Sequence, residues 1–241
     1  MHNINWDYTA GHVDISMPDY VPKALLTLCH PLPKTAQHSP HHWTAPVYGQ
    51  KIQLATTNIS PLLDKLGIQW VQQISGLFLY YSRSCDPTII VALNEISNHH
   101  ASPTKHTKKA CNMLFNYLAI LPDATICYHA SNMVLAVCSN AAYLVLPNAR
   151  SSAAGYFFLT NLPGATSNPP NPKPNGAVHV LCKTLWSVAA SASEAKTGSL
   201  FLNAEEAVPI LTALTVMGHQ QPPTGTPLKT NNATATGILH A

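Results

Sequence analysis

A short apolar run opens the half of the chain that determines the fold: Asn132-Met133-Val134-Leu135-Ala136-Val137-Cys138. Runs of this length and composition are typical of strands buried in a sheet. Residues 155–160 and 178–185 have the same character, so the pattern predicts three strands. Residues 162–176 lie between the second and third strands and are dense in Pro, Asn and Gly, which indicates a long hairpin loop.

A long helical segment is expected after these strands, over residues 187–217. Pro209 should divide it into two helices, because proline lacks the backbone N–H that continues a helix. Gly218 should end the second helix. Residues 227–230 predict a last short strand and residues 234 onward a helix, while residues 125–129 predict a separate short strand that is set aside from this series.

The first half of the chain differs in pattern. Residues 3–17 alternate between apolar and polar types around a turn, which predicts a β-hairpin. Asp19 is the expected N-cap of a helix over residues 20–28, and residues 29–57, rich in Pro and His, are expected to form an extended connector.

Residues 60–99 are expected to be mostly helical, with a new helix beginning at Asp86-Pro87. A further amphipathic helix is expected over residues 104–118, with Lys105, Lys108 and Lys109 on its polar side. Within residues 60–99, apolar residues three or four positions apart predict one helix face, formed by Leu63, Leu66, Trp70, Ile74 and Leu77. The fold class is therefore α+β or α/β, with a small β-hairpin and helical region over residues 1–122 and a mixed sheet with helices over residues 123–241.

Composition limits the possible classes. Apolar residues make up 46% of the 241 residues, enough for a real core, but charged residues only 10%, below the usual value of about 25%. The net charge of +3 leaves a nucleic-acid partner possible without indicating one. Six widely spaced cysteines, no signal peptide and no apolar run near 18 residues predict an intracellular protein, in cytoplasm or nucleus, that does not enter a membrane.

Several segments match one family in consistent order. Residues 4–8 and 13–20 resemble the last palm hairpin and first thumb helix of copia-type retrotransposon reverse transcriptases. Residues 75–87 resemble the family's "G-x-L-x-Y-x-x-x-x-R-P-D" connection motif, with the order Arg-Pro-Asp disrupted. Residues 105–118 resemble the helix before its ribonuclease H domain.

The second half resembles the ribonuclease H domain of the same family. Ser139-Asn140-Ala141 is similar to "S-D-A", and residues 150–156 are similar to "R-S-x-x-G-Y". Residues 193–196 are similar to "x-E-A-E", and residues 230–235 to "x-D-N-x-x-A". The collinear match implies a polyprotein fragment with a truncated ribonuclease-H-like domain. The polymerase aspartates would precede Met1 and the last ribonuclease H aspartate would follow Ala241.

Ribonuclease H cleavage uses two Mg²⁺ ions about 4 Å apart, and carboxylates hold them. The resemblance assigns three of these acid positions to Asn140, Lys196 and Asn231, with Glu194 as the neighbour of Lys196. No aspartate follows Asp123, and the only later acids are Glu194, Glu205 and Glu206. The resemblance therefore implies an inactive domain with no metal site and no cofactor, although the family uses Mg²⁺.

Each of these residues also has an ordinary structural interpretation. In an unrelated fold Asn140 and Asn231 would be ordinary polar residues at strand ends, and Glu194 a solvated helix residue. The three lysines could be a solvated face or could contact the phosphates of an RNA–DNA hybrid or duplex. The implied partners are such a nucleic acid and the rest of a Pol polyprotein. One alternative function is a non-catalytic nucleic-acid-binding module. The other is a structural module, which the low content of charged residues suggests.

Two histidine pairs and one cysteine were further candidates for chemistry. His41-His42 and His99-His100 lack the three or four ligands of a zinc site, so structural or solvated histidines are expected. Cys138 is expected to be a strand thiol and not a nucleophile.

Overall fold

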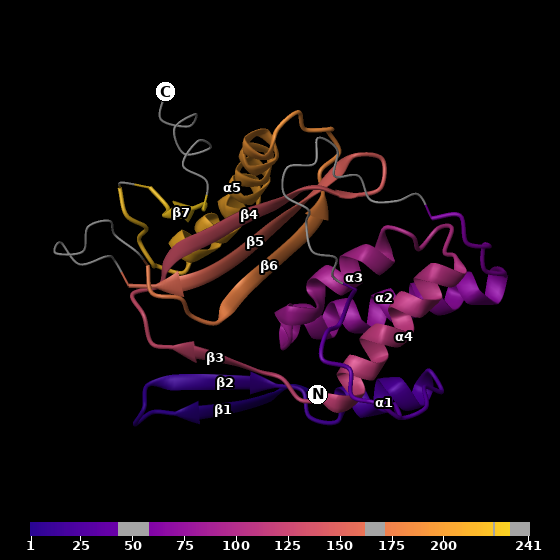
Figure 1. The fold of residues 1–241 in the computed structure, drawn as a ribbon. Coiled ribbons are helices and arrows are strands. Elements are labelled where there is room, and N and C mark those ends of the chain that lie inside the picture. The colour runs from indigo at the N-terminus through magenta and orange to yellow at the C-terminus, as the bar shows by residue number, and fades with distance from the viewer. Residues whose placement is uncertain (43–57, 162–171, 224, 232–241) are drawn as a thin grey trace. The chain divides into compact units, whose positions relative to one another are not determined.

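The computed structural model describes residues 1–42, 58–161, 172–223 and 225–231. It divides into two compact units. Among the described residues, unit 1 holds 1–6, 13–42 and 58–126, and unit 2 holds 7–12 and those from 127 onward. Unit 1 is mainly helical, and unit 2 contains a four-stranded sheet and one long helix (Figure 1). The protein is therefore of the α+β class, as predicted.

Unit 1 is built on the helices α1 (Tyr20–Thr27), α2 (Lys65–Ser84), α3 (Ile90–Ser97) and α4 (Lys105–Ile120), with the short 3-10 helix η1 (Pro87–Ile89) before α3. Their apolar faces meet in one core. The largest fully buried side chains of this core are Ile74, Phe78, Tyr81, Ile89, Leu93, Ile96, Leu114, Phe115 and Leu118.

Short polar side chains begin three of these elements. Asp64 Oδ1 accepts a hydrogen bond from Gly67 N at 2.9 Å and caps α2, and Thr104 forms a capping box with Thr107 at α4. Asp86 Oδ1 accepts from Thr88 N at 3.1 Å, so the predicted helix start at Asp86-Pro87 is confirmed. The prediction for Asp19 is wrong in part: it precedes α1, but it has φ 60° and makes no side-chain cap.

The prediction for the apolar face of α2 is confirmed except at one residue. Ile74 is fully buried and Leu63, Trp70 and Leu77 pack against the core, but Leu66 is 73% exposed. Val71, Phe78 and Tyr81, which lie outside the predicted set, are also fully buried. Val71 and Phe78 directly follow Trp70 and Leu77, so the centre of the buried face is rotated slightly from the predicted one. On α4 the polar side is as predicted, because Lys105, Lys108 and Lys109 are all exposed.

The predicted hairpin is confirmed as β1 (Asn3–Asp7) and β2 (His12–Ser16). The predicted strand over residues 125–129 is also confirmed, as β3 (Thr125–His129). These strands form an antiparallel sheet in the order β1-β2-β3, so β3 belongs with the hairpin and not with the larger sheet.

The larger sheet contains β4 (Val134–Leu146), β5 (Arg150–Thr160), β6 (Ala177–Thr184) and β7 (Leu228–Lys229), in the order β6-β5-β4-β7. The first three strands are antiparallel, and β7 pairs in parallel with β4. This arrangement is compatible with a ribonuclease-H-like sheet. β4 continues eight residues beyond the predicted end at Cys138, so Asn140 lies inside a strand and not at its end.

The helix α5 (Ala192–Val216) runs along one face of this sheet (Figure 1). Ala207 and Leu214 of α5 pack against Leu135, Val137 and Phe157. The predicted break at Pro209 is wrong, because α5 is a single helix. Pro209 and Glu205, whose carbonyl loses its donor, are both exposed to water, and the buried residues on either side of Pro209 hold both halves of the helix on the sheet.

Gly218 ends α5 as predicted. It has φ 91°, and its N–H donates to Thr215 O at 3.0 Å, while His219 N donates to Leu214 O at 2.9 Å. These two bonds form a Schellman motif, in which glycine is favoured because the backbone is left-handed.

Within the described residues α5 alone combines the length and mean hydropathy of a membrane-spanning helix. The sequence contains no uninterrupted apolar run at this place, because Glu205-Glu206 divides it. Three predictions fall wholly or partly outside the described residues: the connector over 29–57 from residue 43 on, the loop over 162–176 up to residue 171, and the helix from residue 234.

Candidate functional site

One cluster of polar side chains brings together β4, α5 and the residue that follows β7 by two positions. Lys196 Nζ donates a hydrogen bond to Asn140 Oδ1 at 3.1 Å and another to Asn231 Oδ1. The two asparagines are exposed and Lys196 is half-buried. Three of the candidate residues are thus in direct contact, although they are far apart in the sequence.

Glu194, the fourth candidate, does not belong to this cluster. Its N–H donates to Ser191 Oγ at 3.1 Å, and its carboxylate accepts from Ala190 N at 2.7 Å. A carboxylate in the first turn also stabilises the positive end of the helix dipole. Glu194 therefore serves the start of α5, and Lys196 is the helix residue that faces the two asparagines.

A buried polar network lies directly beside the cluster. Ser199, fully buried on α5, donates its hydroxyl proton to the carbonyl of Asn140 at 2.6 Å. One turn further along α5, Asn203 is also fully buried, and its Nδ2 lies 2.9 Å from Ser139 Oγ and 3.0 Å from Ala154 O. These bonds fix α5 to β4 and β5 and thereby fix Lys196 over the strand that carries Asn140.

Gly155 makes room for this network. A Cβ atom at Gly155 would lie 1.8 Å from Asn203 Oδ1 and 2.8 Å from Phe157 Cε2. Only glycine fits there, because real Cβ atoms do not approach other atoms so closely. Gly155 belongs to the motif at residues 150–156, but nothing in the local sequence marks Ser199 or Asn203.

The electrostatics of the cluster oppose metal binding. An ammonium group has three N–H donors and no acceptor, and two of them meet amide oxygens here. Mg²⁺ requires oxygen ligands, and negative charge near the ion favours it. Among the described residues, this cluster offers neutral amides and one fixed cation. Such a set of groups disfavours a divalent cation.

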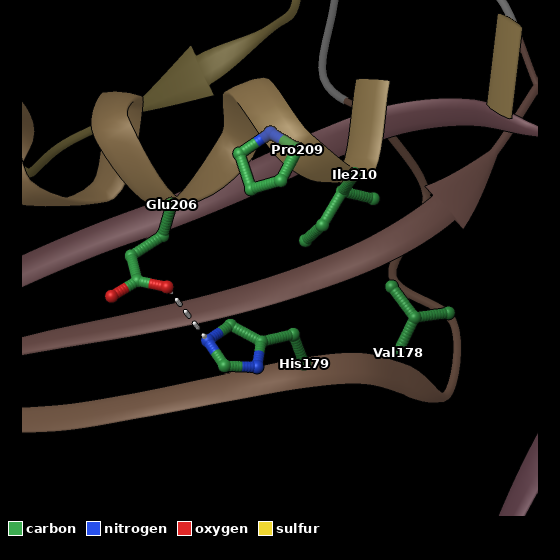
Figure 2. Close-up of a pocket in the computed structure, with 5 residues that line it drawn as sticks. All are labelled: Val178, His179, Glu206, Pro209 and Ile210. Atoms are coloured by element: carbon green, nitrogen blue, oxygen red, sulfur yellow. Dashed lines mark ion pairs between the residues drawn. The ribbon is translucent and has the colours of Figure 1, made fainter. Parts of the chain in front are cut away.

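The two other late acids, Glu205 and Glu206, lie further along the same helix. Figure 2 shows a pocket lined by Val178 and His179 of β6 and by Glu206, Pro209 and Ile210 of α5. The Glu206 carboxylate lies 3.7 Å from His179 Nε2 and 2.5 Å from Lys183 Nζ. Glu206 thus joins α5 to β6, and Glu205 is exposed one residue earlier, so neither acid enters the Lys196 cluster.

The remaining candidates lie apart from the cluster. The pKa of the Cys138 thiol on β4 is raised by burial, which Lys229 partly offsets, so this thiol is a poor nucleophile at neutral pH. His100 Nδ1 contacts Ser97 O, three residues earlier.

The three lysines of α4 are exposed. Lys108 Nζ lies 5.8 Å from the centre of the Trp70 ring, and Lys105 and Lys109 lie on the same helix.

Comparison of the chain with protein-family models, with curated protein sequences and with solved structures gives no match.

Proposed function

We propose that unit 2 is a ribonuclease-H-like domain of copia-type retrotransposon origin that no longer cleaves RNA. The observation that carries this proposal is the position of Lys196, whose ammonium group lies between Asn140 and Asn231. These are the three residues that the resemblance assigns to metal-binding acids, and they come from three separate elements. Their contact across three elements supports the alignment that the resemblance gives.

A domain of this kind would explain the arrangement of the strands and α5, and it is expected not to cleave RNA. The strand order β6-β5-β4-β7, with α5 between β6 and β7 in the sequence, supports a ribonuclease-H-like layout. Two-metal hydrolysis needs the attacking and leaving oxygens to be clamped by cations. A lysine at the centre of the site supplies a positive charge without a metal, but it cannot generate a metal-bound hydroxide. The proposal also implies an intracellular protein, in cytoplasm or nucleus, derived from a Pol polyprotein.

The purified chain is expected to leave an RNA–DNA hybrid intact in Mg²⁺ or Mn²⁺, because no pair of divalent ions can assemble around Lys196. A labelled hybrid incubated with the protein and resolved on a denaturing gel measures this, with an active ribonuclease H as positive control. Turnover that is abolished by EDTA and by Lys196→Ala would overturn the proposal.

A second candidate function is non-catalytic binding to nucleic-acid backbone. The observation that favours it is the exposed row formed by Lys105, Lys108 and Lys109 on α4. Lysines in such a row can contact successive phosphates and release bound counterions.

Binding of a hybrid or duplex is then expected to weaken steeply with salt. The plot of log K against log salt has a negative slope. Replacing the three lysines with glutamine should reduce the magnitude of this slope by about 3, or about 1 for each lost phosphate contact. Fluorescence anisotropy at several salt concentrations measures the slope. Lys23→Gln with Lys65→Gln, on α1 and α2, is the matched control. No binding at low salt, or an equal loss in the control, would eliminate this candidate.

A further inference from the structure

Three side chains with metal-binding atoms converge on the neighbouring strands β2 and β3, outside the Lys196 cluster. His12 is the first residue of β2, and Cys127 and His129 are alternate residues of β3. The three potential ligand atoms, two imidazole nitrogens and one sulfur, all lie within 4.8 Å of one another. All three residues belong to unit 2.

The spacing of these atoms suits a tetrahedral ion. Zinc lies about 2.3 Å from sulfur and about 2.0–2.1 Å from nitrogen, so a sulfur and a nitrogen bound to one tetrahedral zinc are about 3.6 Å apart. Cys127 Sγ lies 3.7 Å from His129 Nε2. The His12 and His129 rings are tilted by 57° with centroids 5.8 Å apart, so small rotations of the side chains can aim both nitrogens at one point.

Hydrogen bonds from neighbouring segments hold the backbone that carries these ligands. Ala130 N donates to Gly11 O at 3.0 Å and joins the two strands next to the cluster. Asn175 bonds both backbone groups of His129, accepting from its N–H at 2.8 Å and donating to its carbonyl at 2.9 Å. Tyr128 donates its hydroxyl proton to Ala177 O at 2.7 Å. The ligands are thus presented by a fixed segment, which lowers the cost of ordering them around an ion.

The chemistry of the donors selects the ion. Two imidazoles and one thiolate form a mixed nitrogen and sulfur set that suits Zn²⁺ and does not suit Mg²⁺ or Ca²⁺. Cys127 carries a thiol and not a disulfide, and it is half-buried, while His129 is exposed, so an ion can enter from solvent. We propose that His12, Cys127 and His129 bind one zinc ion, with the fourth tetrahedral position open to water or another ligand. Binding converts the Cys127 thiol to a thiolate and releases its proton to solvent.

Cobalt titration of the full-length chain tests this site directly. Co²⁺ occupies zinc sites and gives an ultraviolet thiolate-to-metal charge-transfer band together with visible bands of tetrahedral coordination. One Co²⁺ per chain is expected, and Zn²⁺ should displace it and bleach the bands. Cys127→Ser should remove the charge-transfer band and weaken zinc binding at least about 100-fold, as measured by competition with a chromophoric chelator.

Matched variants separate a site from a general effect of cysteine or of folding. Cys29→Ser, which removes an exposed thiol of unit 1, should leave both bands unchanged. His12→Asn keeps the thiol and should also weaken zinc binding. This variant tests the site if circular dichroism shows that Cys127→Ser does not fold. The proposal is overturned if the wild-type chain shows no charge-transfer band, or if zinc affinity is the same in Cys127→Ser and His12→Asn as in the wild type.

Discussion

Gly155→Ala is expected to lower the free energy of unfolding of unit 2 by about 3 kcal/mol, at the upper end of the cost of overpacking a core. The new methyl group would meet Asn203 Oδ1 at 1.8 Å, so Asn203 must leave its place. Asn203 is fully buried and its amide hydrogens bond Ser139 and Ala154, so moving it strands polar groups away from water. Urea unfolding followed by circular dichroism measures the loss.

Two controls test whether the cost arises from this contact. Gly76→Ala, at a helical glycine of α2 with nothing within 4 Å of the new Cβ, should be neutral or slightly stabilising. In an Asn203→Ala background the cost of Gly155→Ala should fall by at least about 1 kcal/mol, because the clashing amide is gone. Additive costs in this double-mutant cycle would show that the Asn203 amide is not what excludes a side chain at residue 155.

The parts of the fold that sequence predicted are those with local causes. The strands over 132–138, 155–160 and 178–185 carry their own apolar patterns, and the turn at Gly218 needs one residue with a left-handed backbone. The errors have tertiary causes. Leu66 fits the helical period of α2 but is exposed, because the core covers the neighbouring side of the helix. Pro209 does not break α5, because both halves of the helix pack on one sheet.

The candidate site shows the same division. Sequence motifs identified Asn140, Lys196 and Asn231, but they could not decide between Lys196 and Glu194. Two residues apart on a helix, these side chains point about 200° from one another, so only the docking of α5 on the sheet settles which one faces inward. No local sequence pattern predicted the roles of Ser199 and Asn203 or the cluster of His12 with β3. Each of these depends on contacts between segments that are distant in the sequence.

Introducing acids at the three clustered positions is expected to create a metal site. The triple variant Asn140→Asp, Lys196→Glu, Asn231→Asp replaces two amides and one ammonium group with three carboxylates from β4, α5 and the segment after β7. Without a metal these carboxylates repel one another, so the variant should be less stable than the wild type. Mn²⁺ should relieve that repulsion and bind at least about 100-fold more tightly than to the wild type, a difference of about 2.7 kcal/mol.

Isothermal titration with Mn²⁺ measures the affinity, and thermal unfolding with and without Mn²⁺ measures the stabilisation that binding confers. Asn140→Asp alone should bind no Mn²⁺, because Lys196 would neutralise the new carboxylate; this variant separates the effect of the lysine from that of added acid. Lys65→Glu, at the exposed start of α2, controls for general negative charge. If the triple variant binds Mn²⁺ no better than Lys65→Glu, the three positions do not form a metal-binding geometry. The proposal that Lys196 occupies a former metal site then loses its support, because it requires these three positions to form a metal-binding geometry once they carry acids.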